Sequence, residues 1–266
     1  MIDIDFLFDS YLDKFIEEEA EGLTEKEVEQ KIAQLYLEFG DKKLTELGGL
    51  SPKEYFASKK SCELIDLLKE CILSGVAVSD YFCTEIEKRE DAKNLLLKTI
   101  IKCENDELCA YAVNLLDVRN FDEALVAYVD FIKNGSFSEG LLEAINEKLT
   151  ENADSVKEIV LSAYKKGEAS SKYFIEVLSF VKQKDDRVFQ ILMDEFKSCK
   201  GNVALFSAYI ARYGDDRALP ELYKKITENG LDYFDYVELK SAIESLGGEV
   251  DEEQVKEKRH FNKIIH

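Results

Sequence analysis

The sequence contains no tryptophan, only two prolines and only two histidines among its 266 residues. Few prolines favour helices, because a proline inside a helix removes a hydrogen bond and clashes with the preceding turn. Both histidines, His260 and His266, stand at the far end of the chain, so no Ser-His-Asp or Cys-His arrangement can be assembled in its body. Acid pairs such as Asp185 and Asp186 are better explained as helix caps and solvated surface than as catalytic groups.

Basic residues are also few, since 35 lysines and arginines stand against 55 acids and give a net charge of −20. This charge repels phosphates and anionic lipid headgroups, so we expect no nucleic-acid partner and no membrane partner. The first residues, Met-Ile-Asp-Ile-Asp-Phe, carry acids where a secretory signal needs basic residues, and no long apolar run follows. The sequence therefore predicts a cytoplasmic location.

The six cysteines form no Cys-x-x-Cys pair and have no histidine nearby, so free, mostly buried thiols are expected in place of a structural zinc site. Gly48 and Gly49 are not followed by the Gly-Lys-Ser/Thr of a phosphate-binding loop. We accordingly predict no metal and no cofactor.

The sequence does have an internal repeat between Glu90 and Gly248. Its first apolar row, the anchors, recurs at spacings of 30 to 32 residues: Ala92, Ala124, Val156, Val188 and Ala218. A second row lies four residues further on: Leu96, Tyr128, Val160, Leu192 and Leu222. A third lies eight residues after the anchors: Ile100, Ile132, Tyr164, Phe196 and Ile226. Spacings of four and eight place each set on one helical face.

Each unit of the repeat carries signals for two helices. An acid stands two residues before every anchor, at a cap or first-turn position: Glu90, Asp122, Asp154, Asp186 and Asp216. A glycine follows four of the anchors and is expected to end the first helix: Gly135, Gly167, Gly201 and Gly230. A second apolar pattern then begins, with residues three apart such as Phe174 and Val177. Each unit is therefore predicted to be a helical hairpin.

A two-helix unit cannot bury its apolar faces alone, so neighbouring units must stack. We predict an all-α fold, a right-handed α-α superhelix (α-solenoid) of about six helical hairpins with N-terminal capping helices. An irregular helical bundle is the alternative. The predicted parts are an N-terminal helical cap at 1–56, repeats at 57–248 and a tail at 249–266 that is acidic and then basic.

The N-terminal part has its own helix signals. Thr24 and Glu27 have capping-box spacing, and Ser51 with Pro52 can open a further helix. Residues 61–88 read as a shorter, sixth repeat. The basic segment 256–263 of the tail is expected to lie against the acidic body or to occupy a helix end, in preference to contacting nucleic acid.

The final unit resembles HEAT repeats, in which an acid and often a proline open the first helix and an alanine followed by leucine and glycine occurs in the second. Here the matching residues are Asp216, Pro220, Ala242, Leu246 and Gly247. The likeness covers roughly residues 60 to 248, although the usual Val-Arg is Val-Glu at 237–238 and the units are shorter than the ~40 to 47 residues of longer HEAT units. Tetratricopeptide repeats would require a Leu-Gly-Tyr pattern and a proline near each unit's end, which do not recur. The resemblance identifies no subfamily.

HEAT-like solenoids include binding scaffolds and some enzymes, namely lyases and glycosylases that act on alkylated bases. Our leading hypothesis is a non-catalytic scaffold that holds a protein or peptide on the concave face formed by its second helices. The enzyme alternative is disfavoured by the acidic charge and the lack of histidine. A third possibility is a regulatory or assembly subunit whose acidic surface mimics or attracts a basic partner. A carboxylate-lined groove would favour a basic ligand, whereas an apolar groove with the acids outside it would favour an amphipathic helix.

Partner-binding residues are predicted from the rotation of the second helices. The positions next to their apolar rows are Tyr111, Asn114, Asn146, Ile175, Leu178, Ile210 and Lys240. If this helix rotation is wrong by one residue, Ile175, Leu178 and Ile210 are core residues. Tyr233 and Phe234, beside carboxylates at the start of the last helix, are predicted either to form a binding edge or to close the core.

Overall fold

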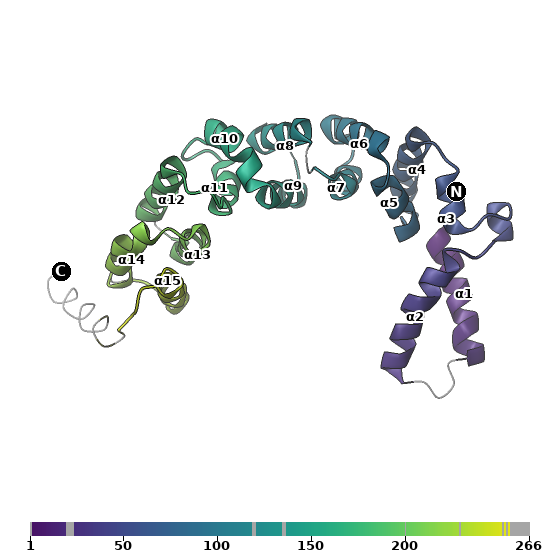
Figure 1. Cartoon of the computed structure of the whole chain (residues 1–266), viewed down its shortest axis with the longest axis horizontal. Helices are drawn as coiled ribbons and strands as arrows, with labels where there is room; N and C mark the ends of the chain where they lie inside the picture. The colour runs from purple at the N-terminus through teal and green to yellow at the C-terminus, as the bar shows by residue number, and fades with distance from the viewer. Residues whose placement is uncertain are drawn as a thin grey trace. The chain divides into compact units, whose positions relative to one another are not determined.

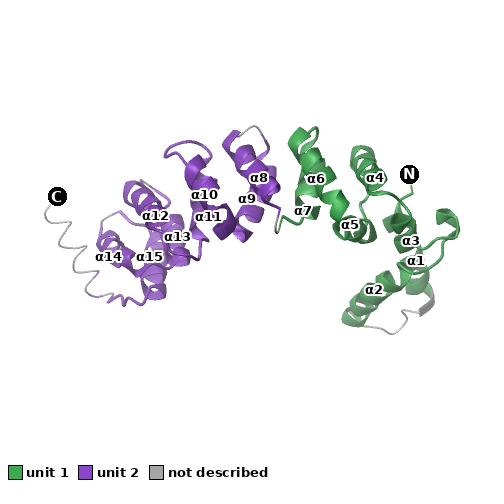
Figure 2. Ribbon diagram, turned by 45° about the horizontal axis from the view of Figure 1, so that its top comes forward, with its two compact units in different colours: residues 1–118 green, residues 119–266 purple. Residues whose placement is uncertain are grey.

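The computed structural model describes residues 2–19, 24–118, 121–134, 137–199, 201–228, 230–251, 253 and 255. These residues form α-helices, two short 3-10 turns and one isolated antiparallel bridge between Leu44 and Leu50 (Figure 1). The all-α prediction is confirmed. The chain divides into two compact units, 1–118 and 119–266 (Figure 2), so the boundary between units falls inside the range 57–248.

Unit 1 contains seven of the described α-helices and one 3-10 turn. In chain order they are α1 (Ile4–Glu19), α2 (Glu25–Phe39), η1 (Thr45–Leu47), α3 (Pro52–Ala57), α4 (Ser61–Ser74), α5 (Asp80–Glu87), α6 (Glu90–Lys102) and α7 (Asp106–Leu115). The expected capping box of Thr24 and Glu27 is present, and Ser51 forms a second one with Glu54.

Aromatic stacking and one half-buried arginine hold the first helices of unit 1 to the rest of the unit. Tyr36 of α2 stacks on Tyr81 of α5 with ring centroids 4.5 Å apart. Phe56 of α3 stacks on Phe82 of α5 at 4.7 Å. Arg89 donates to the carbonyl of Lys59 at 2.6 Å, just past the end of α3, where a cation also complements the helix dipole.

Unit 2 contains the remaining α-helices and one 3-10 turn. They are α8 (Asp122–Asn134), α9 (Glu139–Glu151), α10 (Ala153–Ala163), α11 (Ser171–Ser179), α12 (Asp186–Ser198), α13 (Val203–Tyr213), η2 (Asp216–Ala218), α14 (Leu219–Ile226) and α15 (Tyr233–Ser245). Consecutive helices pack in pairs, and α9, α11, α13 and α15 also contact one another in that order. Figure 1 shows these second helices in one row within the unit and α8, α10, α12 and α14 in the other.

The apolar rows of the repeat form the core. Every anchor, and every residue of the second row, is at most 1% exposed. The predicted starts are confirmed at Glu90, Asp122 and Asp186, the first residues of α6, α8 and α12, and at Asp216, the first residue of η2. Asp154 is the second residue of α10, and its carboxylate accepts hydrogen bonds from the backbone that follows α11.

The predicted helix ends need a correction. Helices α10, α12 and α14 end at Ala163, Ser198 and Ile226, before the glycines expected to end them. The cap residues Tyr164 and Cys199 are extended, so the chain leaves the helix without a left-handed residue, and the glycines lie in the connections. Gly135 lies outside the described residues.

A repeated arginine contact joins successive pairs in unit 2. The Arg187 guanidinium at the start of α12 contacts Asp185 at 2.7 Å and Glu158 of α10 at 2.6 Å. Thirty residues later, Arg217 contacts Asp215 at 2.7 Å and Asp186 of α12 at 2.8 Å. Each arginine therefore ties its own helix start to the preceding first helix, and the recurring Asp-Asp-Arg sequence is structural.

Candidate functional site

A groove of about 630 Å³ lies on the second helices of unit 2, and its size falls within the ~300–1,000 Å³ typical of ligand sites. We call it the acidic groove. It is lined by Glu143, Asn146, Glu147, Thr150 and Glu151 of α9, Lys172, Tyr173 and Glu176 of α11, Phe180, and Leu205 and Tyr209 of α13. Four carboxylates, one ammonium group and several aromatic rings thus share one surface.

The carboxylates of α9 form a stripe along one face of the helix. Glu139, Glu143, Glu147 and Glu151 are spaced four residues apart. Like charges at this spacing repel each other and weaken a helix. Glu139 pairs with Lys172 at 3.0 Å, whereas the other three have no cation within 4 Å among the described residues. Much of the negative charge of the groove is therefore unbalanced.

A buried amide is among the residues that line the groove. Asn146 is 4% exposed, and its Nδ2 donates to Oε2 of Glu176 at 2.8 Å, joining α9 to α11. Its Oδ1 is buried and has no hydrogen-bond donor among the described residues. Because an unsatisfied buried acceptor costs about 1–3 kcal/mol, this oxygen is a candidate contact for a ligand.

Aromatic rings form the wall of the groove on the side of α13. Burial, and then the Glu176 carboxylate, raises the pKa of Tyr209 to about 12, so this phenol stays protonated. The Arg212 guanidinium lies over the Phe180 ring at 4.1 Å and near the Tyr209 ring at 5.5 Å. The wall therefore already holds a cation of the chain itself by cation–π contact.

Of the predicted binding residues, only Asn146 lines the acidic groove. Ile175, Leu178 and Ile210 are core residues, at most 3% exposed, and this corrects the predicted rotation in favour of the alternative. The reason is that α11 contacts α9, α10, α12 and α13, which leaves only a narrow strip of it facing solvent. That strip contains Lys172 and Glu176 and continues to Phe180.

The other predicted residues lie apart from the groove lining. Tyr111 is half-buried and Asn114 exposed on α7 of unit 1, and Lys240 is half-buried on α15. Tyr233 and Phe234 are exposed at 83% and 65% at the start of α15, so they do not close the core. The glutamates of α9 that line the groove are not among the residues predicted from the sequence, although their four-residue spacing is visible there.

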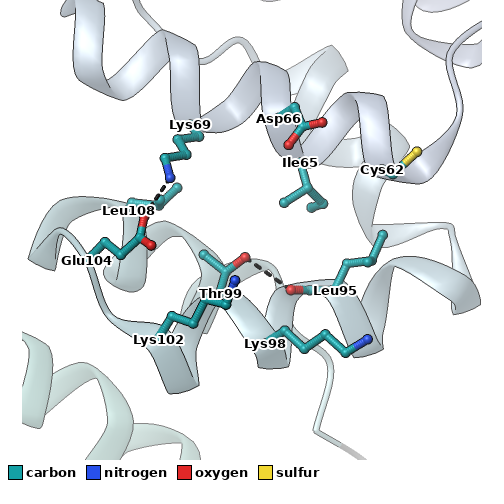
Figure 3. A pocket seen from close by; sticks show the side chains of 10 residues that line it. All are labelled: Cys62, Ile65, Asp66, Lys69, Leu95, Lys98, Thr99, Lys102, Glu104 and Leu108. Carbon is teal, nitrogen blue, oxygen red and sulfur yellow. Dashed lines mark hydrogen bonds and ion pairs between the residues drawn. The ribbon is translucent and has the colours of Figure 1, made fainter.

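Unit 1 has a smaller cavity of about 250 Å³ between α4 and α6 (Figure 3). Of the three lysines that line it, Lys69 is paired with Glu104 at 2.5 Å, and the Thr99 hydroxyl donates to the Leu95 carbonyl at 3.0 Å. Because its volume is below the usual range for ligand sites, the acidic groove is the stronger candidate.

Neither a metal site nor a membrane span is found within the described ranges. No group of three or more histidine, cysteine, aspartate or glutamate side chains is placed there to hold a metal ion. None of the helices that the structure describes has both the length and the apolar character needed to cross a bilayer. None of the six cysteines forms a disulfide, and Cys71 and Cys109 are buried.

In comparisons with known proteins, no family model matches this sequence, and neither a curated protein nor a solved structure matches it. The functional interpretation therefore depends on the chemistry of the groove.

Proposed function

We propose that this chain is a non-catalytic scaffold of HEAT-like repeats in a right-handed superhelix, and that its acidic groove binds a basic segment of a partner protein. The observation that carries the proposal is the stripe of unpaired glutamates on α9 that lines the groove. A chain that retains mutually repelling carboxylates on one surface gains most from a cationic partner, whose charge removes the repulsion.

The pairing of helices supports the scaffold part of the proposal. Successive second helices of unit 2 contact one another, which is the neighbour-to-neighbour packing expected of stacked helical hairpins. The groove crosses three of these second helices, α9, α11 and α13, so an extended segment would contact several repeats at once.

The chemistry of the groove favours binding over catalysis. The Thr150 hydroxyl donates to the Glu147 carbonyl at 2.8 Å, so it is not paired with a general base. The other two hydroxyl groups in the lining belong to tyrosines, and the pKa of the Tyr209 phenol is raised. A hydroxyl that is hard to ionise is a poor nucleophile.

The test measures the affinity of fluorescently labelled arginine- and lysine-rich peptides by anisotropy, with a glutamate-rich peptide for comparison. The variant Glu143→Gln/Glu147→Gln removes two groove charges, and Glu123→Gln/Asp130→Asn removes two exposed charges from α8 of the same unit as a matched control. We expect roughly 2- to 30-fold weaker binding for the groove variant only. Equal losses in both variants, or no preference for basic peptides, would refute the proposal.

A further inference from the structure

A hydrogen-bonded pair of side chains from two helices lines the acidic groove. Asn146 of α9 donates through Nδ2 to Glu176 of α11 at 2.8 Å. This bond fixes the carboxylate next to the amide, and both residues line the groove with Tyr209 and Phe180. An amide oxygen, a carboxylate and two aromatic rings are therefore held within one small region.

The amide oxygen needs a donor that the described residues do not supply. Asn146 is only 4% exposed, and no described residue forms a hydrogen bond with its Oδ1. The equivalent positions in the next two units, Leu178 and Ile210, are core residues, whereas Asn114 and Lys240 in the first and last units are exposed and half-buried. Asn146 is thus a buried polar group with an unused acceptor, which indicates that its partner comes from outside the chain.

The donor should carry a positive charge. Glu176 makes no ion pair among the described residues, and Glu143 and Glu147 also line the groove without a cation within 4 Å. A neutral donor would leave these carboxylates uncompensated, whereas a cationic donor would satisfy the amide oxygen and balance the charge.

The aromatic wall favours a guanidinium over an ammonium group. The guanidinium of Arg212 already lies 4.1 Å from the Phe180 ring centroid, so a planar cation fits this wall. A guanidinium carries five N–H donors in a planar fork and can stack on an aromatic face while it donates to two acceptors.

We propose that Asn146, Glu176 and Tyr209 form a subsite for one arginine side chain of an extended protein segment, and this inference rests on the proposed function. The guanidinium donates to Oδ1 of Asn146 and to the Glu176 carboxylate and lies against the Tyr209 ring. Because Oδ1 is covered in the free chain, the side chain of Glu176 or Asn146 shifts as the arginine enters; a terminal amide torsion has a broad energy well.

The test uses the full chain and four versions of one labelled basic peptide, in which the anchoring position is arginine, lysine, trimethyl-lysine or citrulline. Trimethyl-lysine keeps the charge without N–H donors, and citrulline keeps donors without the charge. We expect the arginine peptide to bind about tenfold more tightly than the trimethyl-lysine and citrulline peptides. The variant Asn146→Leu should remove this preference while still binding basic peptides, with its fold checked by thermal unfolding.

The outcomes separate the two proposals. If no basic peptide binds better than an acidic one, the proposed function itself fails. If basic peptides bind but arginine, lysine and trimethyl-lysine are equivalent, or if a free polyamine competes as well as the arginine peptide, the arginine subsite is refuted. Should Asn146→Leu fail to fold, the comparison of the four peptides on the unmodified chain still decides the matter.

Discussion

Asn146 occupies a position that the next two units of the repeat fill with apolar core residues. The residues 32 and 64 positions later, Leu178 and Ile210, are buried and apolar, whereas Asn114 and Lys240 at the same position of the first and last units are exposed and half-buried. An amide there gives up apolar contact and leaves Oδ1 without a donor. Natural chains keep such a local conflict mainly where function needs it.

The variant Asn146→Leu should therefore be more stable than the unmodified chain. It restores the apolar residue found one repeat later and removes the unsatisfied acceptor, while Glu176, which is only half-buried, regains water as a partner. We expect the free energy of unfolding to rise by about 1 kcal/mol, measured by urea denaturation. A loss of stability of that size would mean that the bond between Asn146 and Glu176 matters more than the unused oxygen.

The free energy of unfolding should depend on pH through the carboxyl group of Asp185. Hydrogen bonding from Arg187 lowers the pKa of its carboxyl, partial burial opposes this effect, and Lys157 adds to it. Since the folded pKa lies below the unfolded value of ~3.9, the stabilisation is complete above about pH 4 and is lost as pH falls through the folded pKa. The half-exposed Arg187 is screened by solvent, which limits the effect to about 1 kcal/mol.

Substituting Asp185→Asn keeps a residue that caps helices well but removes the charge. We expect this variant to lose about 1 kcal/mol of unfolding free energy at neutral pH and to lose less on acidification than the unmodified chain. Denaturation curves recorded from pH 7 down to pH 3 measure both. Parallel pH profiles for the two proteins would show that the contact between Asp185 and Arg187 is not a source of acid sensitivity.

At the scale of single helices, α9 combines a buried apolar face with a face of repelling carboxylates. Glu147 stands between Glu143 and Glu151, four residues from each. The substitution Glu147→Gln removes two like-charge contacts, so we expect a gain of ~0.4–1 kcal/mol in the free energy of unfolding at low salt. Urea denaturation at low and high salt measures it, and the gain should shrink at high salt.

Asp130→Asn on α8 is the control for this prediction, because Asp130 is exposed and has no acid four residues away on either side. If this variant gains as much stability as Glu147→Gln, the gain comes from the net charge of the molecule and not from the stripe.

Helix starts and core rows could be predicted from the sequence, and helix rotation could not. Starts depend on local chemistry, and the acids at Glu90, Asp122 and Asp186 are the first residues of their helices. The exposed strip of α11 depends on which helices surround it, and no local pattern records that. This is why the sequence predicts Leu178 and Ile175 as surface residues and gives no signal for Glu176.

Left-handed helix ends show the same limit. Helix α6 ends at Lys102, and its cap residue Cys103 is left-handed with a φ of 37°, although a cysteine carries no sequence signal for this conformation. Asn146 was predicted as a surface residue from its row and does line the groove, yet the unpaired oxygen that makes it notable is visible only when its surroundings are known.

At the scale of the whole molecule, the chain consists of two compact units, each with its own core. Phe196 of α12 is 1% exposed in unit 2, so Phe196→Ala should cost about 3–5 kcal/mol. Hydrogen exchange should then show reduced protection of the amides of unit 2, while those of unit 1 keep theirs. Uniform loss of protection through both units would mean that they unfold as one cooperative body.

The net charge of −20 also predicts how a partner is captured. A basic segment should associate faster at low ionic strength, because long-range attraction steers the encounter, and added salt should slow association more than it speeds dissociation. Stopped-flow mixing with a labelled basic peptide measures both rates. A rate of association that does not change with salt would contradict electrostatic capture.

The most direct test of the central claim is to map the binding surface by NMR, titrating the isotope-labelled full chain with an arginine-rich peptide. The account predicts that shifted backbone amides concentrate in α9, α11 and α13, and that the side-chain amide of Asn146 shifts with them. Shifts spread over the acidic surface of both units, or concentrated around the exposed Tyr233 and Phe234 of α15, would contradict it.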